Sequence, residues 1–289
     1  MKRNYLYAWI AVAGMTASCS KEVPNNESPA SHVINIEASV APQSRNPQLE
    51  ANGSGTFTTD DVMTLFISGD NIAIPKDYTY NSTLLTWEDL KLPEGTGQVS
   101  FSGCYPQMTV TDGTFEFNTQ TAKDKDLLLA SAQSVTVGTA DPVVLSFDHA
   151  LHYLELNFTA GTGYSNEDIK NLKVTCNAKT TCVVDAAKGS IKETKETKAD
   201  YTSTGTTASF YLVPQATNGI TLTMEVSGET KKLTLDQLFQ QLNNPQTNIT
   251  GGKRCSLTLK INRSGITVEN ATIGAWGNQV TTEGEVVIG

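Results

Sequence analysis

The sequence predicts an all-β protein, on three observations. Short apolar or alternating runs of strand length recur along most of the 289 residues. The segments between them are rich in Thr, Gly, Asn and Asp, which favour turns. Only residues 236–242 (DQLFQQL) have helical character. Many short strands without intervening helices predict β-sandwiches rather than an α/β fold.

Residues 1–18 have the pattern of a signal peptide. Lys2 and Arg3 supply positive charge, and residues 8–17 form an apolar run that is too short to span a bilayer. Small residues then precede Cys19, and this arrangement resembles a bacterial lipobox. We therefore expect Cys19 to become lipidated and to anchor the chain, because a lipoprotein cysteine carries more than one acyl chain. The alternative is a plain secretory signal followed by an unmodified cysteine.

Residues 19–32 are expected to form a flexible tether. The polar stretch Ser20-Lys21-Glu22 resembles the export signal of surface lipoproteins in certain Gram-negative anaerobes, although a solvated tether would have the same composition.

Residues 33–40 are expected to form the first strand. Alternate side chains point to opposite faces of a strand, so one face carries Ile34, Ile36, Ala38 and Val40 and the other Asn35, Glu37 and Ser39. Burial of the apolar face would contribute on the order of 6–10 kcal/mol before entropy is counted. Arg45 follows in a loop rich in Pro, Gln, Ser and Asn. From these residues alone, the segment is either an ordinary first strand or one that can be detached.

The rest of the chain is expected to form two sandwich domains, residues 33–150 and 151–289. The division is placed near residue 150, just before an alternating strand at 152–158. The other expected strands lie at residues 62–67, 98–102, 114–117, 143–147, 171–176, 209–213, 220–226, 231–235, 255–261, 272–276 and 286–288.

The remaining cysteines are Cys104, Cys176, Cys182 and Cys255. The sequence has no CxxC pair, and no histidine is close enough to a cysteine to suggest a zinc site. Cys176 and Cys182 flank residues 177–181, which are expected to form a hairpin loop. In an exported protein this pair is either a cross-hairpin disulfide or two buried thiols.

Composition and motifs argue against several classes of function. A net charge of −9 disfavours nucleic-acid binding, which needs clustered Lys and Arg. We find no nucleophile motif, P-loop or dinucleotide fingerprint, and so expect no catalytic site and no cofactor. His149 and His152 are three residues apart in a β segment, where their side chains point to opposite faces, so we expect no metal there. No known calcium-loop spacing fits the aspartates at 60, 61, 124 and 126.

An ordered set of short motifs carries a family resemblance. After the lipobox, the strand and the arginine, these are Phe101-Ser102-Gly103-Cys104-Tyr105-Pro106, Asp126-Leu127-Leu128-Leu129-Ala130, Leu145-Ser146-Phe147-Asp148-His149-Ala150-Leu151, Leu212-Val213-Pro214-Gln215, Gly251-Gly252-Lys253 and Ile273-Gly274-Ala275-Trp276. In this order and at these spacings, the set resembles the fimbrillin-like family, subunits of the type V pili of Gram-negative gut and oral anaerobes.

The resemblance implies two tandem transthyretin-like Greek-key sandwiches and a non-enzymatic role. It also implies a precursor held at the outer membrane by lipid on Cys19 and cut after an arginine by a trypsin-like protease. Here the cut would fall between Arg45 and Asn46, although Ser44-Arg45-Asn46 departs from the Thr-Arg-Ala often seen. The cut would remove the first strand and open a groove for a donor strand from the next subunit. The expected donor is Val286, Val287 and Ile288, or else residues 271–276.

We therefore expect a structural subunit, stalk or tip, of a surface fimbria with a role in adhesion. Its partners would be other pilin subunits, the protease and membrane lipid, and not nucleic acid. The alternative is a surface lipoprotein that binds glycan or host ligands and never polymerises. Such a surface would need exposed aromatic side chains, for which Trp87, Trp276, Tyr78 and Tyr80 are the candidates.

Overall fold

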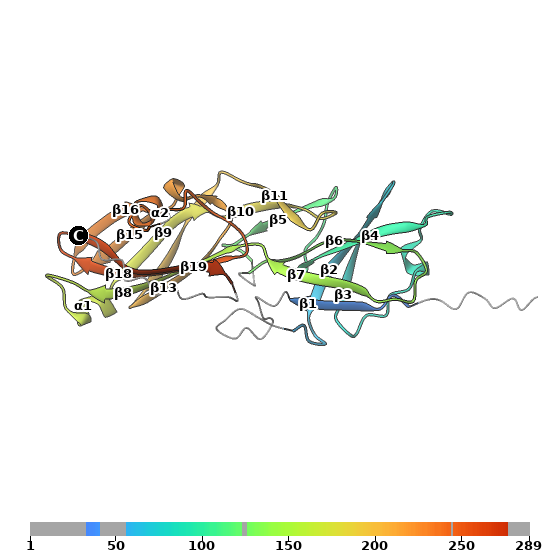
Figure 1. The fold of residues 1–289 in the computed structure, drawn as a ribbon, viewed down its shortest axis with the longest axis horizontal. Coiled ribbons are helices and arrows are strands. Elements are labelled where there is room, and N and C mark those ends of the chain that lie inside the picture. Colours follow the sequence, from blue (N-terminus) through green and yellow to red (C-terminus); the bar gives the residue numbers. More distant parts are fainter. Residues whose placement is uncertain (1–32, 41–55, 123–125, 244, 277–289) are drawn as a thin grey trace, which may run out of the picture. The chain divides into compact units, whose positions relative to one another are not determined.

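The computed structural model describes residues 33–40, 56–122, 126–243 and 245–276 (Figure 1). Cys19, Arg45, Asn46, Val286, Val287 and Ile288 therefore lie outside the described residues. The all-β prediction is confirmed, because the described chain is built from five sheets with only short helical segments. The two α-helices among these residues are α1 (Asn166–Lys170) and α2 (Leu235–Phe239).

A six-stranded sheet forms the first layer, in the order β1-β7-β6-β4-β2-β3. Its strands are β1 (Ile36–Val40), β2 (Val62–Gly69), β3 (Ile72–Thr79), β4 (Gln98–Tyr105), β6 (Leu128–Thr136) and β7 (Val143–His149). All neighbours are antiparallel except β1 and β7, which are parallel. One face buries Met63, Leu65, Ile67 and Phe101 against side chains of the connection that follows β3, among them Leu85 and Trp87. We call this the first core.

A three-stranded sheet packs on the other face of the six-stranded sheet. It consists of β5 (Thr114–Asn118), β10 (Thr181–Asp185) and β11 (Ser190–Thr194), in the order β11-β10-β5. Phe66 and Cys104 from the larger sheet meet Phe115 and Phe117 there. The three-stranded sheet thus takes strands from both sides of residue 150, and the division near that residue stays a prediction.

Two four-stranded sheets face each other in the C-terminal part, with the orders β12-β9-β15-β16 and β13-β8-β18-β19. The first contains β9 (Lys173–Lys179), β12 (Lys198–Thr204), β15 (Thr221–Val226) and β16 (Glu229–Thr234). The second contains β8 (His152–Ala160), β13 (Thr207–Leu212), β18 (Lys253–Asn262) and β19 (Gly265–Ala275), which run side by side in Figure 1. A further short pair joins β14 (Gln215–Ala216) to β17 (Asn248–Ile249).

Strict alternation builds the core of this C-terminal sandwich. Leu154, Leu156 and Phe158 of β8 point inward beside Leu257 and Leu259 of β18. Each α-helix begins with a capping box, Ser165 with Asp168 for α1 and Thr234 with Gln237 for α2. The helix expected at 236–242 is thus present as α2, shifted and shortened at its C-terminal end.

The prediction of a hairpin loop at residues 177–181 is wrong. β9 pairs with β12 and β15, whereas β10 pairs with β5 and β11, so the chain changes sheet at Thr180. Cys176 and Cys182 consequently lie in two different cores, and both are free, buried thiols rather than a disulfide. Burial raises the pKa of each thiol to about 12.

Candidate functional site

The side chains of the first strand alternate as the sequence predicts. Ile34, Ile36 and Val40 are only 3%, 3% and 6% exposed, and Ala38 is partly buried. Asn35, Glu37 and Ser39 are exposed on the other face. The apolar face of β1 is thus an integral part of the first core.

The backbone of this segment is held on two sides. From Ile36 to Val40 it pairs in parallel with β7, in the register that places Ala38 opposite Leu145. Before β1, the Ile34 N–H donates to the carbonyl oxygen of Leu85 at 2.8 Å. Val33 forms an isolated bridge with Thr86. The regular ladder therefore begins at Ile36 rather than at residue 33, and residues 33–34 contact the connection that follows β3.

The first half of β7 depends on β1 for its ladder. β6 pairs with β7 only from Phe147 to His149, opposite Leu128 to Ala130. In the described part of the chain, residues 143–146 find their strand partner in β1 alone. Loss of β1 would therefore leave the backbone groups of these residues along an open edge.

Aromatic side chains line the first core beneath β1. The Phe147 ring meets the Phe57 ring edge-on, with ring centroids 5.0 Å apart. Gly103 of β4 makes room for Phe147, because a Cβ at that position would lie 3.0 Å from the Phe147 Cζ atom. The Trp87 ring meets Phe101 edge-on at 6.0 Å. Removal of the β1 face would uncover an apolar groove.

Hydrogen bonds fix the connection that the start of the strand contacts. The N–H and Oγ1 of Thr86 both donate to Asp89 Oδ2, at 2.9 and 2.8 Å. These bonds favour the charged carboxylate and so lower the pKa of Asp89. The turn at residues 86–89, which Val33 contacts, is thus stabilised by its own hydrogen bonds.

Sequence reasoning missed the contributions of Phe57 and of residues 85–86. They lie in connections rather than in alternating strands, and no periodicity signals them.

The two histidines have separate surroundings. His149 Nδ1 contacts the Asp126 Oδ2 atom, and the His149 ring stacks on Trp276 with centroids 3.6 Å apart. His152 Nδ1 lies 3.1 Å from the carbonyl oxygen of Thr250, and burial lowers the His152 pKa to about 4. Among the described residues, no group of three or more His, Cys, Asp or Glu side chains is placed to hold a metal ion.

The aromatic side chains proposed for a sugar platform are mostly covered. Tyr78, Trp87 and Trp276 are 5%, 8% and 5% exposed, and Tyr80 packs on Phe57 with centroids 5.9 Å apart. Tyr78 and Tyr80 therefore do not form an exposed platform.

Within the described ranges, none of the helices has the length and apolar character needed to cross a bilayer.

Comparison with known proteins gives a consistent result. The profile of the fimbrillin-like family matches residues 48–276. No curated protein sequence matches significantly.

Among solved structures, a candidate cell adhesion protein from Bacteroides uniformis superposes with a TM-score of 0.63 at 17% identity, covering 86% of this chain and 99% of that one. A fimbrilin from Porphyromonas gingivalis superposes with a TM-score of 0.53 at 9% identity, covering 86% and 98%. A candidate cell adhesion protein from Bacteroides ovatus gives 0.53 at 17%, covering 84% and 96%.

Proposed function

We propose, from the premise that this chain belongs to the fimbrillin-like family, that it is a fimbrial subunit assembled by strand exchange and acting in adhesion. The chain would be exported as a lipoprotein through Cys19 and cut between Arg45 and Asn46. The cut would detach β1, and a strand from the next subunit would take its place. The observation that carries the proposal is the position of β1, an edge strand that completes both a core and a ladder.

Three properties make β1 separable. In the described part of the chain it pairs with β7 alone, it is parallel to that strand, and it has only five residues. Parallel pairing is slightly less stable per residue than antiparallel pairing. The family profile begins at residue 48, beyond both β1 and Arg45. The matched region therefore lies within the part of the chain that would remain after the cut.

The site that β1 leaves would attract another strand. Ile34, Ile36 and Val40 together account for about 5–9 kcal/mol of apolar burial, before entropy, at about 1.5–3 kcal/mol for each side chain. An extended segment can recover this burial and also pair with the open backbone of residues 143–146. Before the cut, β1 occupies the site as part of the same chain, at high effective concentration, and so blocks exchange.

Of the two expected donors, residues 286–288 are the better candidate. Residues 271–275 lie within β19, which pairs with β18 from Gly265 to Ala275. Their use as a donor would break that ladder, and Trp276 would also lose its 2.7 Å hydrogen bond to the Lys253 carbonyl oxygen. A donor from Val286 to Ile288 requires neither loss. Such a head-to-tail contact does not close on itself and propagates into a filament.

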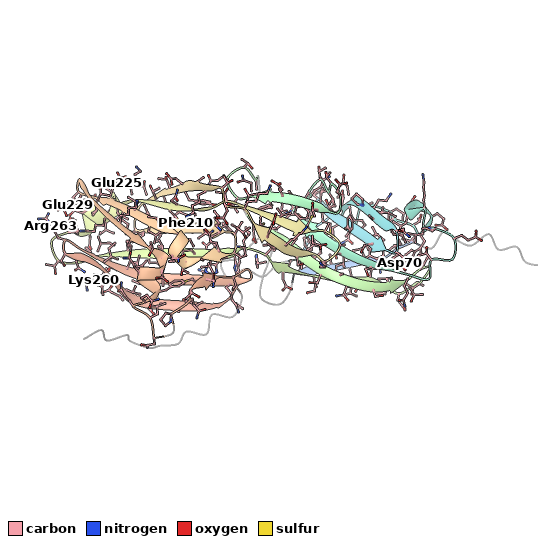
Figure 2. All side chains as sticks on the ribbon, turned by 90° about the horizontal axis from the view of Figure 1, so that it is seen from above. Asp70, Phe210, Glu225, Glu229, Lys260 and Arg263 are labelled. Carbon is pink, nitrogen blue, oxygen red and sulfur yellow. The ribbon has the colours of Figure 1, made fainter. Side chains whose placement is uncertain are left out.

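The test is size-exclusion chromatography before and after mild trypsin treatment, with mass spectrometry of the new N-terminus. We expect the cut wild-type chain to begin at Asn46 and to form oligomers, while Arg45→Ala stays uncut there and monomeric. Arg263→Ala is the matched control, because Arg263 is an exposed arginine far along the chain (Figure 2). Deletion of residues 283–289 should weaken assembly without unfolding the protein.

A peptide with the sequence of residues 33–40 gives a sharper version of the test. It should inhibit oligomerisation of the cut protein, whereas the same peptide with Ile36→Asp should not. A cut wild-type protein that stays monomeric at high concentration would overturn the proposal in favour of the non-polymerising lipoprotein.

A further inference from the structure

A second surface feature is built without β1 or β7. A cavity of about 560 Å³ is lined by residues 60–62, 105–108, 116–118 and 121–122. These segments include the start of β2, the end of β4 and the end of β5, and none of them belongs to β1 or β7. The volume falls within the roughly 300–1,000 Å³ typical of small-ligand sites.

The cavity combines an apolar wall with hydrogen-bonding groups. Pro106 and Met108 contribute apolar surface, and the half-buried Tyr105 adds an aromatic ring to the lining. Phe57 supports that ring, with centroids 5.6 Å apart. Because Tyr105 is packed in this way, it presents a fixed surface rather than a mobile one.

The polar groups are of the kinds that recognise hydroxyls. Asp60 supplies carboxylate acceptors, while Gln107 and Asn118 supply amides that can both donate and accept. The Oδ1 of Asn118 accepts from the Gln120 N–H at 2.8 Å, which orients the amide. The lining thus offers both donors and acceptors beside the apolar wall.

Charged ligands fit this lining poorly. The lining contributes the carboxylates of Asp60, Asp61 and Glu116, whose negative charges disfavour an anion. Two of the three carboxylates are already engaged, Glu116 by Lys195 and Asp61 by the N–H and Oγ1 of Thr58. Asp61 keeps its charge, but its Oδ2 atom already accepts two hydrogen bonds and is less available to a cation. The described residues also hold no cluster suited to a metal ion.

We propose that this cavity binds a neutral sugar unit of a glycan. The C–H face of the ring would pack on Tyr105 and Pro106, and its hydroxyls would bond to Asp60 and Asn118. The inference goes beyond the strand-exchange role and does not depend on it, because β1 and β7 take no part in the lining.

The test uses the uncut chain, with β1 in place, on an array of neutral and sialylated oligosaccharides. The strongest neutral trisaccharide is then titrated by calorimetry against the wild type, Asp60→Asn and Asn118→Ala. We expect binding to neutral glycans and a loss of about tenfold in affinity for each variant, as the removal of one or two hydrogen bonds predicts.

Asp70→Asn is the matched control, because Asp70 is an exposed aspartate in the turn between β2 and β3 (Figure 2). It should bind as the wild type does. Binding to sialylated glycans alone, no binding on the array, or neutral binding unaffected by both cavity variants would each overturn the proposal. These outcomes are independent of the oligomerisation test, so the two proposals can fail separately.

Discussion

The edge strands β1 and β19 hold their places by different physical means. β19 has 11 residues, is antiparallel to β18, and follows it after only a short turn. β1 has five residues, is parallel to β7, and pairs with a strand more than 100 positions further along the chain. Closing a long loop costs more entropy than closing a turn. An edge strand can therefore be essential to a core and still be the part most easily exchanged.

The substitution with the largest expected effect, Leu145→Ala, tests whether the stability of the first core depends on β1. In a chain that begins at residue 19, Leu145→Ala should lower the free energy of unfolding by about 2–5 kcal/mol, because Leu145 is fully buried opposite Ala38. In a chain that begins at Asn46 the same substitution should cost much less, since the groove is already open. Denaturant unfolding of both forms measures the difference.

Leu257→Ala is the control for this experiment. Leu257 is equally buried, in the C-terminal sandwich, and its loss should cost a similar 2–5 kcal/mol, to order of magnitude, in both forms. An equal cost of Leu145→Ala in the two forms would mean that the first core closes without β1.

A smaller effect concerns the C-terminal sandwich, whose stability should decrease at acidic pH because of His152 in β8. Burial lowers the pKa of His152 to about 4, below the roughly 6.5 of an unfolded histidine. Between pH 4 and pH 6.5, therefore, His152 is protonated in the unfolded chain and neutral in the folded protein. The stability contributed by neutral His152 is complete above pH 6.5 and is lost as the pH falls toward 4, by about 3 kcal/mol in all.

Urea unfolding at pH 7.5 and 4.5 measures this loss. His152→Gln should be less stable at pH 7.5 but should show a correspondingly smaller decrease on acidification. An unchanged pH dependence in that variant would assign the effect to other groups.

The smallest expected effect concerns one helix end. Ser165→Ala removes the cap of α1 and should cost about 1 kcal/mol. Ser209→Ala, in an exposed position of β13, should change stability by only a few tenths of a kcal/mol. If the cap variant also altered the fluorescence of Trp87 in the first core, the two regions would be coupled more tightly than their separate cores suggest.

Sequence patterns predicted most of the strands that bury one face and missed several strands at sheet edges. β8 and β18 alternate strictly and were predicted with small errors at their ends. β3, β6, β11 and β12 were missed. β3, β11 and β12 are edges of their sheets, β11 and β12 bury no side chain fully, and β6 buries only its first three residues. A strand that buries few side chains is held mainly by backbone pairing, which leaves no period in the sequence.

The candidate site was predicted in part for the same reason. The apolar face of residues 34–40 follows from alternation, but its partner β7 and the contact of Ile34 with Leu85 are long-range pairings. The cavity near Tyr105 was not predicted at all, because four separate segments meet there.

The three-stranded sheet has a consequence for the order in which the chain can fold. β5 is made early, yet its partner β10 and the edge strand β11 are made only after the first six-stranded sheet is complete in sequence. Until residues 181–194 are synthesised, β5 lacks its strand partner, and Phe115 and Phe117 are covered only by the side of the core that the six-stranded sheet supplies. Emerging chains with uncovered apolar strands are prone to aggregate. The three-stranded sheet can therefore be completed only after part of the C-terminal half of the chain has been made.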